Sequence, residues 1–143
     1  MGHSFTSFRE KHIRSKDYKV ETWLLLVVSE IDDLTDKPEW LNQARVCWED
    51  QGMQGVNGSI DPNLDDYLID DDRINMFKTL CCRVYSKLEG FGETIPREFL
   101  NRLHELESPN DIREDNVTEP YLSFGRKLKS LLDGEQTEEC VDA

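Results

Sequence analysis

The sequence has no hydrophobic run long enough to cross a membrane. Its longest apolar run, Trp23–Val28, covers six residues, whereas a transmembrane helix needs about 20. The run also lies too far from the N-terminus for a secretory signal peptide, and no cleavage site follows it. We therefore expect a cytoplasmic protein.

The sequence also lacks the residue patterns that are typical of catalytic and metal-binding sites. Its four cysteines, Cys47, Cys81, Cys82 and Cys140, have no C-x-x-C spacing. Adjacent helical cysteines point about 100° apart, so Cys81 and Cys82 are poor disulfide partners and we expect reduced thiols. The three histidines lack the i, i+4 partner of a helical zinc pair, and no glycine-rich loop follows a strand. We therefore expect no enzyme, no cofactor and no metal.

One stretch invites a calcium interpretation. Asp61, Asn63 and Asp65 would occupy positions 1, 3 and 5 of an EF-hand loop. Asp66 then stands where glycine makes the sharp turn, and Asp72 replaces the long bidentate glutamate. The stretch is therefore interpreted as helix caps on an acidic surface.

Basic residues are also scarce. The net charge is −13, and residues 30–72 contain thirteen acidic and only two basic side chains. Such a surface repels phosphate backbones at long range, which argues against binding of nucleic acid. It favours a basic protein partner, or it serves solubility alone.

Helical periodicity is the strongest positive signal. In residues 70–91 the apolar positions recur every three or four residues, as on one helix face, and Asp70 or Asp71 can cap the first turn. We expect this helix to be the central packing element. The 143 residues suit one core, and we predict an all-α domain of five or six helices over residues 1–132, followed by an acidic flexible tail, residues 133–143.

Five further helices and a short turn have start signals or apolar stripes of their own. Thr6–Arg14 is predicted as an amphipathic helix, and Asp17–Ile31 as a helix buried on more than one side. Asp36 is the expected cap of a helix that begins at Pro38, and Thr94 the expected cap of the helix after Pro96. A short helical turn that opens at Asp61-Pro62 is expected to carry Leu64, Tyr67, Leu68 and Ile69, and a last helix begins at Pro120.

The acidic stretch before and within the start of the 70–91 helix is the candidate partner-binding surface. Helix capping does not need all of these carboxylates, and a cleft lined by Lys or Arg would relieve their repulsion. An aromatic residue among them could serve as an amphipathic anchor. The predicted residues are Glu49, Asp50, Asp61, Asp65, Asp66, Tyr67, Asp70, Asp71 and Asp72.

Three segments together resemble small helical immunity proteins of contact-dependent growth inhibition and related bacterial polymorphic toxin systems. They are WLNQARVCW at 40–48, DPNLD at 61–65 and GETIPREFL at 92–100. The resemblance covers roughly residues 35–105. It implies a cytosolic protein that binds its cognate toxin domain, in many systems a nuclease with a basic cleft, and blocks the active site.

A second function remains open from the sequence. Residues 1–6 fit the pattern for N-myristoylation, and basic side chains follow up to Lys19. The alternative to an immunity protein is therefore a regulatory adaptor or scaffold that binds a basic protein or docks at a membrane through its N-terminus.

Overall fold

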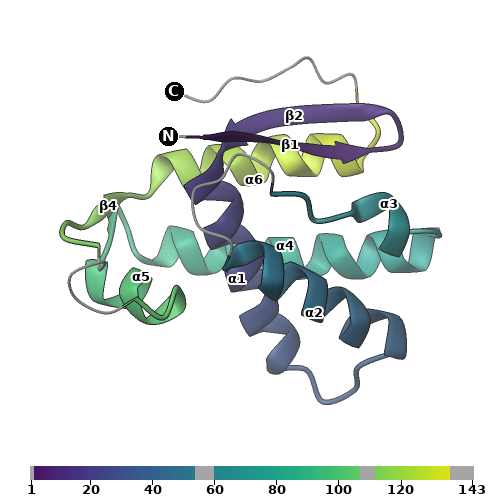
Figure 1. Ribbon diagram of the computed structural model, residues 1–143, viewed down its shortest axis with the longest axis horizontal. Helices are drawn as coiled ribbons and strands as arrows, with labels where there is room; N and C mark the ends of the chain where they lie inside the picture. Colours follow the sequence, from purple (N-terminus) through teal and green to yellow (C-terminus); the bar gives the residue numbers. More distant parts are fainter. Residues whose placement is uncertain (1, 54–59, 107–111, 136–143) are drawn as a thin grey trace.

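The computed structural model describes residues 2–53, 60–106 and 112–135, and within them the chain is mostly helical (Figure 1). The four strands form two separate two-stranded antiparallel sheets. The prediction of a helical protein is confirmed, whereas the prediction of a purely all-α domain was wrong. In chain order the elements are β1 (His3–Phe8), β2 (Lys11–Lys16), α1 (Asp17–Asp32), α2 (Glu39–Gly52), α3 (Leu64–Tyr67), α4 (Asp71–Gly90), β3 (Thr94–Ile95), α5 (Arg97–Leu103), β4 (Asn116–Val117) and α6 (Glu119–Leu132).

A β-hairpin stands where an N-terminal helix, Thr6–Arg14, was predicted. His3 pairs with Lys16 and Phe8 with Lys11, and the two residues between the strands, Arg9 and Glu10, both have positive φ. Burial alternates along β1, as on a strand with one face on the core. Figure 1 shows the hairpin lying along α6, which both of its strands contact.

The helix at the centre of the packing is α1 rather than α4. It contacts α2, α4, α5, α6 and both strands of the hairpin, and it buries side chains over its whole circumference from Val20 to Val28. This confirms the prediction of a helix buried on more than one side. A run of six large apolar residues can be covered only when other elements surround it.

Helix α4 has the predicted bounds and the predicted cap. The Asp70 carboxylate accepts a hydrogen bond from the backbone N–H of Arg73 at 2.9 Å, which satisfies one of the free N–H groups of the first turn. The two other predicted caps were wrong. Helix α2 begins after Pro38 without any side-chain cap, and Thr94 lies in β3, so α5 begins after Pro96.

The buried residues form one hydrophobic cluster between these helices. Its largest members, Trp23, Trp48, Phe77 and Phe124, are each at most 2% exposed. The ring of Trp48 packs on Phe77 with the centroids 4.9 Å apart, and Trp23 meets Phe124 edge-on at 5.8 Å. No helix among the described residues is both long and apolar enough to span a membrane.

Candidate functional site

Six of the eight predicted acidic residues lie on α3, on the segment before it and at the start of α4 (Figure 1). Pro62, Leu64 and Leu68 anchor this stretch because their side chains are buried. The indole N–H of Trp48 donates to the Pro62 carbonyl at 2.8 Å, and the Asp61 carboxylate accepts from the Asn63 N–H. The side chains between the buried positions therefore face solvent. We call Asp61, Asp65, Asp66, Asp70, Asp71 and Asp72, all exposed, the acidic patch.

Half of the acidic patch has a structural task. Asp61 closes the turn before α3, Asp70 caps α4, and Asp65 accepts a hydrogen bond at 2.9 Å from the backbone N–H of Arg9 at the tip of the hairpin. The side-chain carboxylates of the other three, Asp66, Asp71 and Asp72, have no hydrogen bond or ion pair with any part of the chain that the structure describes. The α4 dipole stabilises Asp71 and Asp72 at its N-terminus, but their charges remain available to a partner.

The remaining predicted residues have mainly internal contacts. Tyr67 is half-buried, and its ring lies 6.1 Å from that of Trp48. Burial raises the pKa of the Tyr67 hydroxyl, and the neighbouring Cys47 thiol adds to this effect. Tyr67 therefore packs partly against the core, and its role in binding a partner stays a prediction.

The two predicted residues on α2 lie beside an ion pair rather than within the patch. Glu49 is 3.5 Å from Arg45, and the same guanidinium makes two shorter bonds, of 2.6 and 2.9 Å, to Asp32. Asp50 is exposed but also has a partner inside the chain. The C-terminal end of α2 contacts the acidic patch at Gln51, next to Asp50. The side-chain oxygen of Gln51 accepts a hydrogen bond from the backbone N–H of Asp61.

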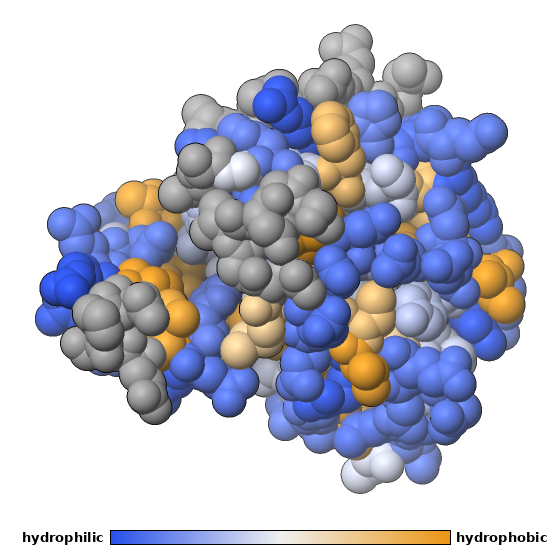
Figure 2. Space-filling view, viewed as in Figure 1, coloured by the Kyte–Doolittle hydropathy of each residue, from blue (hydrophilic) through white to orange (hydrophobic). Residues whose placement is uncertain are grey.

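An exposed isoleucine, Ile69, lies within the acidic patch and was not among the predicted partner-binding residues. Ile69 is 63% exposed, because α3 ends at Tyr67 and the following residues leave helical geometry. Leu68 then faces inward and Ile69 outward. Figure 2 shows one isolated hydrophobic area within hydrophilic surface at the right edge, where Figure 1 has the connection from α3 to α4.

Arg73 fixes the connection that carries Ile69. Its guanidinium donates to the Tyr67 carbonyl at 3.2 Å and lies over the Trp40 ring, 5.0 Å from the centroid. The same side chain is 4.0 Å from the Asp70 carboxylate. These contacts join α2, α3 and α4 and hold the connection between α3 and α4, with its acidic residues, in one arrangement.

The acidic patch has no geometry for a metal. Among the described residues no three His, Cys, Asp or Glu side chains lie close enough together to hold an ion. Asp61 and Asp65, which would be ligands in the calcium interpretation, accept hydrogen bonds from backbone N–H groups.

The N-terminal basic segment, on which the membrane alternative depends, is partly engaged in the fold. Lys19 is 2% exposed, and burial lowers its pKa to about 8. The Lys11 ammonium donates to the carbonyls of Gly134 and Glu135. Lys11 and Lys19 are therefore not part of a free basic surface of the N-terminal segment.

The chain has no match among protein-family models, curated proteins or solved structures.

Proposed function

We propose that this chain is an immunity protein that binds a basic bacterial toxin domain and covers its active-site cleft with the acidic patch. The observation that carries the proposal is Ile69, a largely exposed apolar side chain among carboxylates of which three have no cationic partner in the described residues. A charged rim around an apolar centre is the arrangement of a protein-binding hot spot.

The carboxylates account for fast and selective encounter. Any two carboxylates separated by about 7 Å in water repel each other by about 0.6 kcal/mol, and a cationic cleft would replace such repulsion within the patch by attraction. The net charge of −13 extends the field beyond the patch. Such fields raise association rates by up to about a thousandfold at low salt and lose this effect as salt is added.

Ile69 accounts for slow release. Burying an isoleucine side chain contributes about 1.5–3 kcal/mol, which corresponds to roughly a tenfold to hundredfold slower dissociation. A nuclease is the toxin class that fits this chemistry best, since its cleft already binds anionic phosphates. The inhibitor and nucleic acid should then compete for one site.

Association kinetics test the proposal. We expect Asp66→Lys and Asp72→Lys to slow association with the toxin domain at least tenfold at low salt, and to reduce its salt dependence. Asp70 is a poor test position, because its replacement also removes the α4 cap, which is worth about 1 kcal/mol. Glu89→Lys is the matched control, since Glu89 is exposed near the other end of the same helix.

Ile69→Ala should leave the association rate unchanged and speed dissociation tenfold or more. The proposal of this interface is wrong if Asp66→Lys, Asp72→Lys and Glu89→Lys all associate at the same rate, or if Ile69→Ala dissociates like the unmodified protein.

A further inference from the structure

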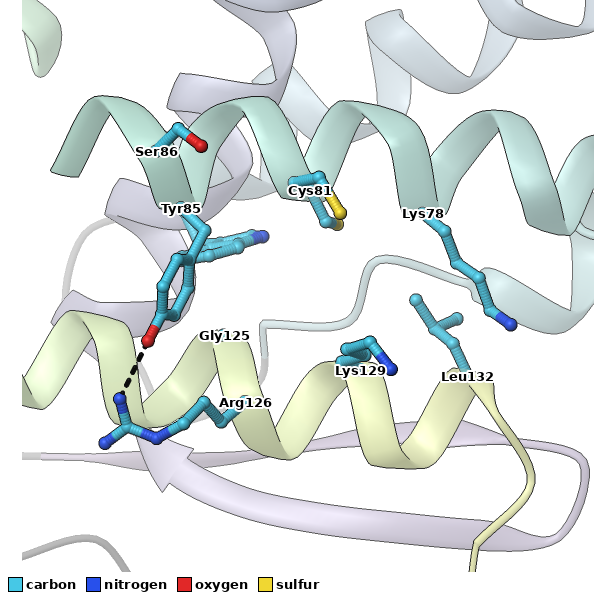
Figure 3. Close-up of a pocket in the computed structure, with 10 residues that line it drawn as sticks. Lys78, Cys81, Tyr85, Ser86, Gly125, Arg126, Lys129 and Leu132 are labelled. Carbon is cyan, nitrogen blue, oxygen red and sulfur yellow. Dashed lines mark hydrogen bonds between the residues drawn. The ribbon is translucent and has the colours of Figure 1, made fainter. Parts of the chain in front are cut away.

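A pocket of about 260 Å³ opens between α4 and α6 and shares no residue with the acidic patch. Figure 3 shows that α4 supplies Lys78, Cys81, Tyr85 and Ser86, whereas α6 supplies Gly125, Arg126, Lys129 and Leu132. Trp23 of α1 also lines the pocket. Small residues on the two facing helices leave this space open, between Tyr85 at one end and Lys78 at the other (Figure 3).

The inner wall of the pocket is apolar. Trp23 and Leu132 are at most 4% exposed, and Cys81 is buried. Burial raises the pKa of the Cys81 thiol to about 12, so this side chain is neutral at physiological pH. The Trp23 indole N–H is buried and makes no hydrogen bond of full geometry among the described residues; it faces the Cys81 thiol, a weak acceptor.

The rim is basic although the chain is strongly acidic. Lys78, Arg126 and Lys129 line the pocket, and no Asp or Glu does. At the Leu132 end the two ammonium groups already share one carboxylate, since Asp133 lies 2.5 Å from Lys78 and 2.7 Å from Lys129. This pair shows that the geometry of the pocket mouth accepts a carboxylate.

The opposite end of the rim has hydrogen-bond donors that remain available to a ligand. The Tyr85 hydroxyl accepts from Arg126 at 2.9 Å, and its own proton has no acceptor among the described residues. Arg126 also pairs with Glu119, but its side chain is 51% exposed and has five N–H donors. A ligand carboxylate placed here would receive the Tyr85 proton and a charge-assisted bond from Arg126.

We propose that this pocket binds a small amphipathic monocarboxylate, with its hydrocarbon part over Trp23 and Leu132 and its carboxylate on Tyr85 and Arg126. The volume equals that of about nine water molecules at roughly 30 Å³ each, which suits an unbranched acid of about ten non-hydrogen atoms. Octanoate is the probe of that size. This binding is independent of the acidic patch and of any toxin.

Titration of the full chain with octanoate, followed by the three indole N–H signals in ¹⁵N–¹H correlation spectra, tests the proposal. We expect the Trp23 signal to shift saturably, and that of Trp48, whose N–H is bonded to Pro62, to stay in place. Octan-1-ol, which has the same chain without the charge, should bind at least tenfold more weakly. Shifts of both signals would indicate unfolding by a detergent-like ligand and would overturn the proposal, as would equal binding of the alcohol.

Two substitutions examine the assigned carboxylate contacts. Arg126→Gln and Tyr85→Phe should each weaken octanoate binding at least fivefold and leave octan-1-ol binding unchanged. Arg83→Gln is the matched control, because Arg83 is exposed on α4, does not line the pocket, and its loss changes the net charge by the same amount. Equal affinities of Arg126→Gln and Arg83→Gln for octanoate would overturn the assignment.

Discussion

Replacing Gly125 by alanine tests how tightly α6 is packed on α1. In a helix interior this change normally stabilises a protein by about 1 kcal/mol. Here the added Cβ would stand 2.9 Å from one carbon of the Trp23 indole, closer still to another, and 3.2 Å from the Tyr85 ring. Trp23 is 1% exposed and packed edge-on against Phe124, so the indole cannot move aside cheaply.

The expected result is a net loss of stability. Overpacking of a dense core costs typically 1–3 kcal/mol, and this cost outweighs the gain in helix propensity. We therefore expect Gly125→Ala to lower the free energy of unfolding by about 1–2 kcal/mol, measured by urea denaturation followed by circular dichroism. Gly90→Ala is the matched control, because a Cβ at Gly90 in α4 meets no atom within 4 Å. That variant should be as stable as the parent or slightly more stable. A Gly125→Ala protein at least as stable as Gly90→Ala would refute the close packing of α6 on Trp23.

Two further predictions concern charge and pH. Burial lowers the pKa of His104, whose Nε2 lies 2.8 Å from the Thr22 hydroxyl. Because the unfolded chain binds a proton on this imidazole more readily than the folded chain does, the free energy of unfolding decreases as pH falls below about 6.5. Urea denaturation at pH 8 and at pH 5 should show a smaller decrease for His104→Gln than for the parent or for His12→Gln. The Arg45 hydrogen bonds lower the pKa of Asp32, so Asp32→Asn should cost about 0.5–1 kcal/mol at pH 7, a value limited by solvent screening. This difference should shrink as pH falls through the lowered pKa of Asp32 and the parent carboxylate is protonated, and an unchanged difference at that acidic pH would contradict the ion-pair explanation.

The long amphipathic helices could be predicted from the sequence because their signals are local. The apolar face of α4 recurs over 20 residues, and Asp70 caps it from the adjoining position. The breadth of the apolar stripe in α1 likewise predicted burial on several sides. Such patterns need no knowledge of the rest of the chain.

The hairpin was not predicted because the apolar residues of its sequence fit the helical period as well as the strand period. Phe5, Phe8 and Ile13 suit a helix face, but Phe5 is 49% exposed on the outer face of the hairpin and packs on His12. The turn, Arg9-Glu10, has none of the Asn or Gly residues that usually mark a two-residue connection with positive φ. Its bond to Asp65, 56 positions away, depends on tertiary structure and leaves no local signal.

The acidic charge of the candidate site could be predicted from the sequence, but the exposed isoleucine at its centre could not. Exposure of the aspartates followed from their type, but only the structure separates Asp65, which holds the hairpin tip, from Asp66, which is unpaired among the described residues. The exposure of Ile69 could not be predicted, because it depends on α3 ending at Tyr67. A four-residue helix such as α3 is too short for its end to be located by periodicity.

The measurement that tests the central claim most directly is co-purification of the chain with the product of the adjacent gene, where the toxin of an immunity pair would be encoded. The account predicts an equimolar complex with a basic toxin domain, loss of that complex with the double variant Asp66→Lys/Ile69→Ala, and its retention with Glu89→Lys. Absence of any complex would contradict the immunity function, and a complex that the double variant retains in full would contradict the acidic patch as its interface.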